Sequence, residues 1–202
     1  MKVGVLASGA GTNLQAILDR VHGREGVEVV AVGSDKADAA ALDRAATAGV
    51  PSAVFPLDAH TDRADRDTAM AAFLESHGVE LVVLAGYMAL LTPAFLARFP
   101  QRVINVHPAL LPAFPGVRAI EQALEYGVKV FGVTVHFVDA GVDTGPVIAQ
   151  RAVELPDATG VGEVREALRP LEHALLCDAV VQIARGAVRF DPERPRRVTV
   201  GR

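Results

Sequence analysis

Residues 2–13 read KVGVLASGAGTN, and this stretch decides the fold. The apolar run over residues 2–7 ends in a glycine turn at residues 8–11, and apolar side chains then recur at helical spacing over residues 12–21. A β-strand, a glycine turn and an α-helix in this order are typical of the first repeat of a parallel α/β sheet. We therefore expect an α/β protein whose first strand and first helix flank the turn.

The same alternation of strand and helix patterns continues along the chain. Short β-branched runs predict strands at residues 27–32, 52–55, 81–85, 102–106, 129–138 and 147–154. Helical spacing predicts helices at residues 37–48, 63–76 and 161–184, and Pro170 should kink the last helix or mark its true start. The run at residues 81–85 is apolar throughout, which favours a central strand buried on both faces.

These elements predict the fold class. The last two strands are close enough in sequence for a hairpin, so the sheet should be mostly parallel but mixed. We expect one α/β domain over residues 1–188, with a Rossmann-like sheet flanked by helices. Residues 189–202 should form a basic, solvated C-terminal tail, which contains Arg194, Arg196, Arg197 and Arg202 beside two prolines.

Composition excludes several classes of partner. The 202 residues carry a formal net charge of -4, so no global positive field favours nucleic acid. The only cysteine, Cys177, lies in an apolar helical run and is expected to be a buried hydrophobic residue in a reducing compartment. No signal peptide or membrane-spanning pattern is present, so we expect a soluble, cytoplasmic protein. The six histidines lack paired ligand spacing, so no metal site is expected.

The glycine turn is a candidate anion site. Between a strand and a helix, it places backbone N–H groups and the positive end of the helix dipole at the carboxyl edge of the sheet. Ser8, Thr12 and Asn13 could add hydrogen bonds to a phosphate. The turn lacks the third glycine of the dinucleotide fingerprint and a Walker lysine. A plain strand-to-helix turn is therefore the alternative interpretation.

Asn105, His107 and Asp143 form a candidate reaction centre. Asn105 and His107 alternate on one side of a strand that Pro108 ends, and Asp143 lies in a glycine-rich turn. These residue types suit the attack of an amine on a formamide-like carbonyl, because the tetrahedral intermediate needs a donor for its oxyanion and a route for protons. Spacing alone leaves the alternatives open, since a strand-end histidine often only packs and an aspartate before Thr-Gly-Pro often only forms a turn.

Five stretches carry a resemblance to a known family: VLASGAGTNLQAI, SDKADAAALDRA, VVLAGYMALLTPAFL, VINVHPALLPAFPG and GVTVHFVDAGVDTGPVIAQ. They span nearly the whole chain, and in this order they resemble the folate-dependent formyltransferase family. The resemblance implies the formyltransferase fold, with residues 1–188 as the catalytic domain. It also implies transfer of the formyl group of 10-formyltetrahydrofolate, as co-substrate, to the amine of glycinamide ribonucleotide in purine biosynthesis, by a monomer or homodimer.

The resemblance also implies roles for individual residues. His107 would be general acid and oxyanion stabiliser, Asn105 would hold the formyl oxygen, and Asp143 would raise the pKa of the histidine and pass a proton. The ribonucleotide would contact Gly11, Thr12, Asn13 and, through its ribose hydroxyls, Glu172. The folate would contact Arg63, Met88, Ala89, Leu90, Leu91, Asn105, Asp139, Ala140, Gly141, Val142 and Asp143.

Ala89, Arg169 and Pro170 depart from the family pattern, and His136 has two possible roles. Ala89 stands where relatives often carry a basic residue, so its pterin contact would be through the backbone alone. Arg169 and Pro170 stand where the family commonly has polar residues, which affects the ribose side of the site. His136 shares a strand face with Thr134, and the pattern leaves open whether it lines the pocket or packs.

Two kinds of alternative function remain. Formyltransferases that act on tRNA or sugar nucleotides, and the formyltetrahydrofolate hydrolase, carry extra domains, so chain length favours the glycinamide ribonucleotide reaction. A non-catalytic nucleotide-binding module that kept the glycine turn is the alternative from another class. It predicts that Asn105, His107 and Asp143 are dispensable.

Overall fold

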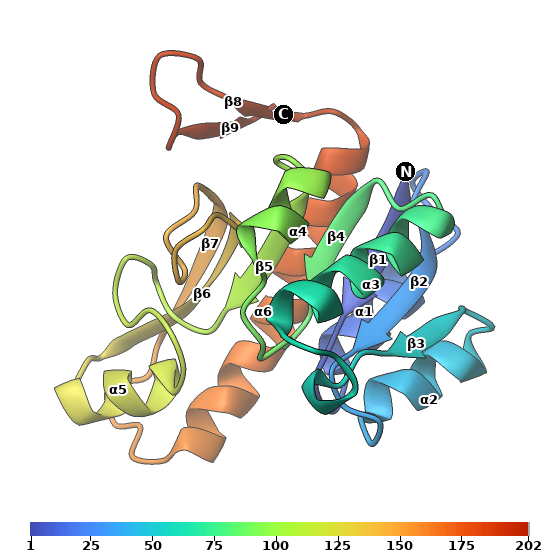
Figure 1. Ribbon diagram of the computed structural model, residues 1–202. Helices are drawn as coiled ribbons and strands as arrows, with labels where there is room; N and C mark the ends of the chain where they lie inside the picture. The colour runs from blue at the N-terminus through green and yellow to red at the C-terminus, as the bar shows by residue number, and fades with distance from the viewer. Residues whose placement is uncertain (202) are drawn as a thin grey trace. The chain divides into compact units, whose positions relative to one another are not determined.

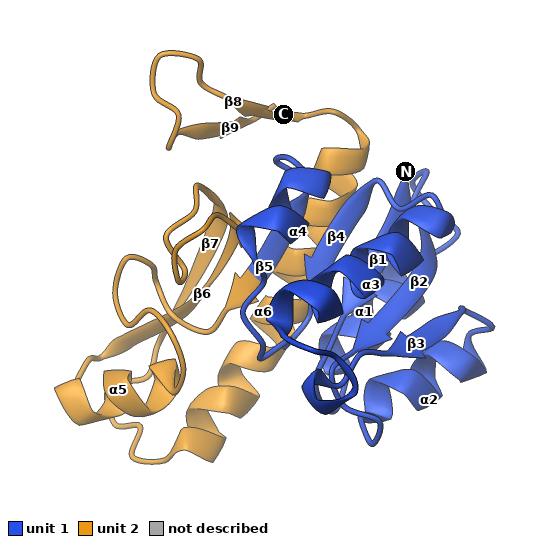
Figure 2. Cartoon of the chain, viewed as in Figure 1, with its two compact units in different colours: residues 1–105 blue, residues 106–202 orange. Residues whose placement is uncertain are grey.

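The computed structural model describes residues 1–201. It contains two compact units, residues 1–105 and residues 106–202 (Figure 2), and Arg202 lies outside the described part. Each unit is described by itself below. The proposed boundary between a catalytic domain and a tail at residue 188 stays a prediction, and the tail's Arg202 is outside the described residues.

Residues 1–105 form the parallel part of the fold (Figure 1). The elements are β1 (Lys2–Leu6), α1 (Thr12–Arg20), β2 (Glu28–Ser34), α2 (Ala40–Thr47), β3 (Ser52–Val54), the 3-10 turn η1 (Leu57–Ala59), α3 (Arg63–Ser76), β4 (Leu81–Leu84), α4 (Pro93–Arg98) and the start of β5 (Val103–His107). Their strands follow the order β3-β2-β1-β4-β5. This confirms the strand and helix alternation that the sequence predicts.

The core of this first unit surrounds β4. All four residues of β4 are buried, as expected for a strand covered on both faces. Helix α1 packs with α2, and α3 packs with α4. An N-cap explains α4, which the sequence pattern missed: the Thr92 side chain accepts a hydrogen bond from the Phe95 N–H, and Pro93 opens the helix.

Residues 106–201 contain an antiparallel pair and the longest helix. The elements are α5 (Ala119–Tyr126), β6 (Val130–Phe137), β7 (Val147–Glu154), α6 (Val161–Ala184), β8 (Val188–Phe190) and β9 (Val198–Val200). Strands β6 and β7 pair antiparallel, which confirms the predicted hairpin and the mixed character of the strand pairing. Helix α6 packs on both strands, and its buried residues include Cys177, as predicted.

One sequence expectation is corrected in this unit. Pro170 does not mark the start of α6, because the helix begins at Val161 and contains the proline. The region where a basic tail is expected contains the hairpin of β8 and β9, and Arg194, Arg196 and Arg197 are exposed. Throughout residues 1–201, every helix falls short of the length and apolarity that a membrane crossing requires.

Candidate active site

His107 ends β5 and is almost completely buried, at 5% exposure. Its Nε2 lies 2.8 Å from the carbonyl oxygen of Phe114, and its Nδ1 lies 3.3 Å from Oδ2 of Asp143. A carbonyl can only accept, so Nε2 carries a proton and donates it to Phe114. The structure thus brings together His107 and Asp143, two of the three residues predicted to form the reaction centre.

Asp143 is held from three directions. Its Oδ2 also accepts a hydrogen bond of 2.7 Å from the Gly116 N–H, and its Oδ1 lies 3.5 Å from Nε2 of His136. The side chain is only 12% exposed. The Gly116 N–H favours the ionised carboxylate, and each histidine does so as well when its ring carries a second proton.

His136 is the second histidine of this cluster. The sequence left open whether His136 lines the site or packs, and the structure places its Nε2 toward Asp143 while Nδ1 lies 2.8 Å from the Phe137 carbonyl. The side chain is buried, at 1% exposure. The Asp143 carboxylate is therefore shared by two imidazoles. The sequence analysis assigned a catalytic role only to His107.

The hydrogen bonds of the cluster give it a capacity for one more proton. Each imidazole donates one N–H to a backbone carbonyl and turns its other nitrogen toward Asp143. In a neutral imidazole that second nitrogen carries only a lone pair, which here faces a carboxylate. A proton added to either ring would turn this contact into a charge-assisted hydrogen bond. The cluster can therefore accept a proton and later return it.

The pKa of His107 depends on opposing influences. Burial lowers the pKa of His107, the Phe114 carbonyl and the Asp143 charge oppose that shift, and His136 adds to it. The Asp143 charge thus raises this pKa, as the sequence analysis expects, and burial outweighs its contribution. For Asp143 itself, burial raises the pKa, but the hydrogen bonds from His136 and Gly116 and the two histidine charges lower it to about 2.

A titration of His107 tests this balance directly. We expect nitrogen-15 NMR to give His107 a pKa below the ordinary imidazole value, and Asp143→Asn to lower it further because the favourable carboxylate charge is lost. The exposed Asp157→Asn removes the same charge elsewhere and should leave the His107 pKa unchanged. A wild-type pKa above the ordinary value, or a rise in Asp143→Asn, would contradict the assignment.

Strained backbone conformations position both partners of His107. Phe114 has φ 53° and Asp143 has φ 52°, in the left-handed region that non-glycine residues seldom adopt. The loop that carries Phe114 is tied to the hairpin, because the Thr134 hydroxyl donates to the Ala109 carbonyl and accepts from the Leu111 N–H. Gln150 on β7 donates to the same hydroxyl. These bonds explain how the loop maintains an unfavourable conformation beside the histidine.

Asn105 is the third predicted member. It lies in β5, two residues before His107, and is half-buried. Strand alternation directs both side chains to the same side of β5. This placement agrees with the sequence expectation for the pair.

The glycine turn, in the first unit, follows the carboxyl end of β1. Gly11 is the N-cap of α1 with φ 67°, and a side chain there would put a Cβ 2.8 Å from the Ala41 backbone. The Arg44 guanidinium donates a 2.8 Å hydrogen bond to the Ala10 carbonyl. Thr12 begins the helix and Asn13 is buried, at 8% exposure. Ala41 and Arg44, both in α2, thus border the turn that was predicted to bind phosphate.

Besides Asn105, the predicted folate residues of the first unit lie at two places. Met88, Ala89, Leu90 and Leu91 form a loop after β4, with Met88 65% and Leu90 54% exposed. Arg63 is the exposed first residue of α3. The Ser8 hydroxyl accepts a 2.8 Å hydrogen bond from the Met88 N–H, so the glycine turn and this loop are in contact. Exposed apolar side chains on an anchored backbone suit a flat heteroaromatic ring such as a pterin.

The remaining predicted ligand residues belong to the second unit. Asp139 organises the loop before Asp143, because its Oδ1 accepts hydrogen bonds from the Gly141 N–H and the Thr144 hydroxyl. Ala140, Gly141 and Val142 are exposed between them, and Glu172 is half-buried in α6. Among residues 1–201, no cluster of histidine, cysteine and carboxylate side chains is arranged to hold a metal ion.

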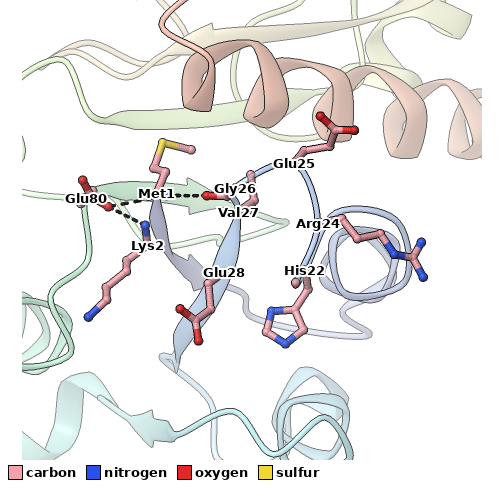
Figure 3. A pocket seen from close by; sticks show the side chains of 10 residues that line it. Met1, Lys2, His22, Arg24, Glu25, Gly26, Val27, Glu28 and Glu80 are labelled. Carbon is pink, nitrogen blue, oxygen red and sulfur yellow. Dashed lines mark hydrogen bonds and ion pairs between the residues drawn. The ribbon is translucent and has the colours of Figure 1, made fainter.

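A separate pocket of about 590 Å³ lies in the first unit, at the amino ends of β1 and β2 (Figure 3). Some of its polar groups bond to one another: the Met1 ammonium donates to the Gly26 carbonyl, and the Lys2 N–H donates to Glu80. Ligands of open α/β sheets bind at the carboxyl ends of strands. Within the first unit, this rule favours the carboxyl end of β1, where the glycine turn lies, over this pocket as a ligand site.

Comparison with known proteins gives one consistent result. Residues 1–180 match the family model described as "Formyl transferase". A phosphoribosylglycinamide formyltransferase of Mycobacterium tuberculosis is 44% identical over 200 residues, which cover 98% of this chain and 93% of that protein. One from Bacillus subtilis is 38% identical over 183 residues, which cover 90% of this chain and 94% of the relative.

Solved structures agree with the sequence matches. The crystal structure of glycinamide ribonucleotide transformylase 1 from Symbiobacterium toebii aligns with a TM-score of 0.95 and 46% identity, and it covers 100% of this chain and 94% of that one. A phosphoribosylglycinamide formyltransferase from Anaplasma phagocytophilum aligns with a TM-score of 0.91 and 32% identity, over 99% and 94% of the two chains. These alignments confirm the α/β fold class that the sequence predicts.

Proposed function

The chain belongs to the formyl transferase family, and from this membership we infer that it transfers the formyl group of 10-formyltetrahydrofolate to the amine of 5-phosphoribosylglycinamide in purine biosynthesis. The observation that carries this function is the match to phosphoribosylglycinamide formyltransferases over almost the full length of both chains. The aligned 200 residues cover 98% of this chain and 93% of the Mycobacterium tuberculosis relative.

We propose that the cluster around Asp143 moves the protons of this reaction. Attack of the substrate amine on the formyl carbon releases a proton, which the second nitrogen of a neutral His107 can accept directly, through Asp143 or through water. His107 then acts as general acid toward the departing folate nitrogen. To stabilise the oxyanion, its Nε2–H group would exchange the Phe114 carbonyl for the oxyanion as its acceptor, and the Asn105 amide would hold the same oxygen.

We propose that the ligand-binding residues are those expected from the sequence. Gly11, Thr12 and Asn13 would bind the phosphate through the first turn of α1, where N–H groups lack intrahelical partners. Glu172 would accept hydrogen bonds from the ribose hydroxyls. The folate would contact the loops at residues 88–91 and 139–143, and Arg63 would contact its carboxylate end. A cytoplasmic monomer or homodimer is part of the same proposal.

Gly11→Ala tests the phosphate site. We expect it to raise the KM for the ribonucleotide about tenfold or more, because a Cβ at this position meets the Ala41 backbone at 2.8 Å and must displace the turn. Gly49→Ala is the matched control, since Gly49 has a similar φ of 68° but open space around its Cβ position. Steady-state kinetics would contradict the assignment if both variants changed this KM equally.

An assay with one substrate omitted at a time tests the function. Purified protein should form tetrahydrofolate only when 10-formyltetrahydrofolate and the ribonucleotide are both present. Absence of turnover would contradict the proposal and favour a non-catalytic binding module. Formate released without the amine substrate would instead indicate a hydrolase.

A further inference from the structure

Arg66 and Asp67 form a buried ion pair between neighbours on α3. Their side chains are only 3% and 1% exposed. The Arg66 Nε and Nη2 donate hydrogen bonds of 2.9 and 2.6 Å to the same oxygen, Oδ1 of Asp67. Adjacent helix residues usually point in different directions, so this geometry requires specific surroundings.

The surroundings are the loop that follows β4. Arg66 Nη2 also donates a 3.0 Å hydrogen bond to the Leu90 carbonyl. The other oxygen of Asp67, Oδ2, accepts a 2.6 Å hydrogen bond from the Thr92 N–H. Each member of the pair therefore holds one backbone group at the far end of the loop.

Ser8 fixes the near end of the same loop. The Ser8 N–H donates to the Gly86 carbonyl at 3.1 Å, and its hydroxyl accepts from the Met88 N–H at 2.8 Å. The intervening Tyr87 side chain is buried at 7% exposure. Four backbone groups of residues 86–92 are thus fixed, while Met88 and Leu90 expose their side chains.

Stability alone is a weak explanation of this pair. Burying an arginine and an aspartate costs desolvation of both charges, and apolar residues of similar volume commonly stabilise a core as well or better. What an apolar pair could not supply is a donor for the Leu90 carbonyl and an acceptor for the Thr92 N–H. The benefit of the pair therefore lies in the conformation of the loop.

We propose that Arg66 and Asp67 are positioning residues for folate: they preorganise the loop at residues 88–91 so that its backbone and apolar side chains meet the pterin ring. This inference rests on the proposed function of that loop. Their side chains are only 3% and 1% exposed, so they would act on folate through the loop. Without the pair, the loop must be ordered when folate binds, which weakens folate affinity and leaves ribonucleotide affinity unchanged.

Asp67→Asn is the primary test. Asparagine keeps the size of the side chain, but it has one acceptor oxygen where Asp67 uses two. Either Arg66 or the Thr92 N–H therefore loses its acceptor. We expect the KM for 10-formyltetrahydrofolate, and the Kd for tetrahydrofolate by calorimetry, to rise about tenfold or more, with the KM for the ribonucleotide within about twofold of wild type. Arg66→Lys keeps the charge but loses the fork, and should give a smaller rise of the same kind.

Two variants on α3 serve as controls. Glu75→Gln breaks the exposed ion pair with Arg98, and Leu74→Ala opens the buried core without touching the loop. Both should leave the folate KM and Kd unchanged, and Leu74→Ala should lower the melting temperature. If Asp67→Asn lowered only the fraction of folded, active protein, as Leu74→Ala would, and left the folate KM and Kd unchanged, the inference would be overturned.

The remaining outcomes separate the two proposals. Should Asp67→Asn not fold, Arg66→Lys decides, and an unchanged folate Kd in that variant overturns the inference. Failure of the wild type to transfer formyl groups would refute the proposed function, whereas normal wild-type turnover with unchanged folate binding in both variants would refute only the role of the pair.

Discussion

His107→Ala is expected to lower kcat on the order of 10³-fold or more, because one substitution removes the proton carrier and an oxyanion donor. Its Nε2–H and its Nδ1 contact with Asp143 are both lost. Ground-state binding of either substrate depends little on these groups, so both KM values should stay within a few-fold of wild type.

Two further measurements keep this result interpretable. The melting temperature reports whether the buried cavity left by the imidazole has disturbed the fold, since His107 is only 5% exposed. Added imidazole should restore part of the activity if the lost group is a proton carrier. A kcat within tenfold of wild type would contradict the role of His107 and favour a packed strand-end histidine.

Asp143→Asn should lower kcat by roughly 10²-fold or more, because both histidines then lose the carboxylate that they share. Asparagine is the appropriate replacement, since it tolerates the left-handed φ of 52° better than alanine does. It also keeps an oxygen that can accept from the Gly116 N–H. The fall in kcat therefore measures the effect of the Asp143 charge more than the effect of a changed loop conformation.

Asp157→Asn is the matched control for this variant. It removes one carboxylate charge from an exposed position after β7, and its kcat should equal that of the wild type. Equal losses in the two variants would assign the effect to overall charge. An unchanged kcat in Asp143→Asn would leave the cluster without a role in proton transfer.

Much of the fold could be predicted from local sequence patterns. The ranges 63–76, 147–154 and 161–184 coincide with α3, β7 and α6, because strong periodicity and clear end signals define them. The short helices α4 and α5 were missed, since six to eight residues give too few turns for a periodic signal. The prediction that Pro170 could mark the start of α6 was wrong because contacts along the helix outweigh one missing backbone donor.

The candidate site was predictable only where side chains carry the information. His107 and Asp143 were singled out by residue type and by the family resemblance, whereas Phe114 and Gly116 act through backbone groups that almost every residue type offers. His136 lies beside a register shift in the hairpin, after Val135, so alternation alone could not decide its direction.

The buried ion pair was missed for a different reason. Arg66 and Asp67 look like an ordinary surface pair in a helix rich in charges, and only their contacts with residues 90 and 92 reveal their burial. Such contacts between distant parts of the chain depend on tertiary structure and leave no local pattern.

Formyl transfer is most directly tested by following a carbon-13 formyl group from 10-formyltetrahydrofolate in the presence of protein and ribonucleotide. We expect the wild type to move the label to a new amide on the glycinamide nitrogen. We expect His107→Ala and Asp143→Asn to do so at rates lower by orders of magnitude. Label that remains on folate, appears as formate, or moves equally fast in all three proteins would contradict these expectations.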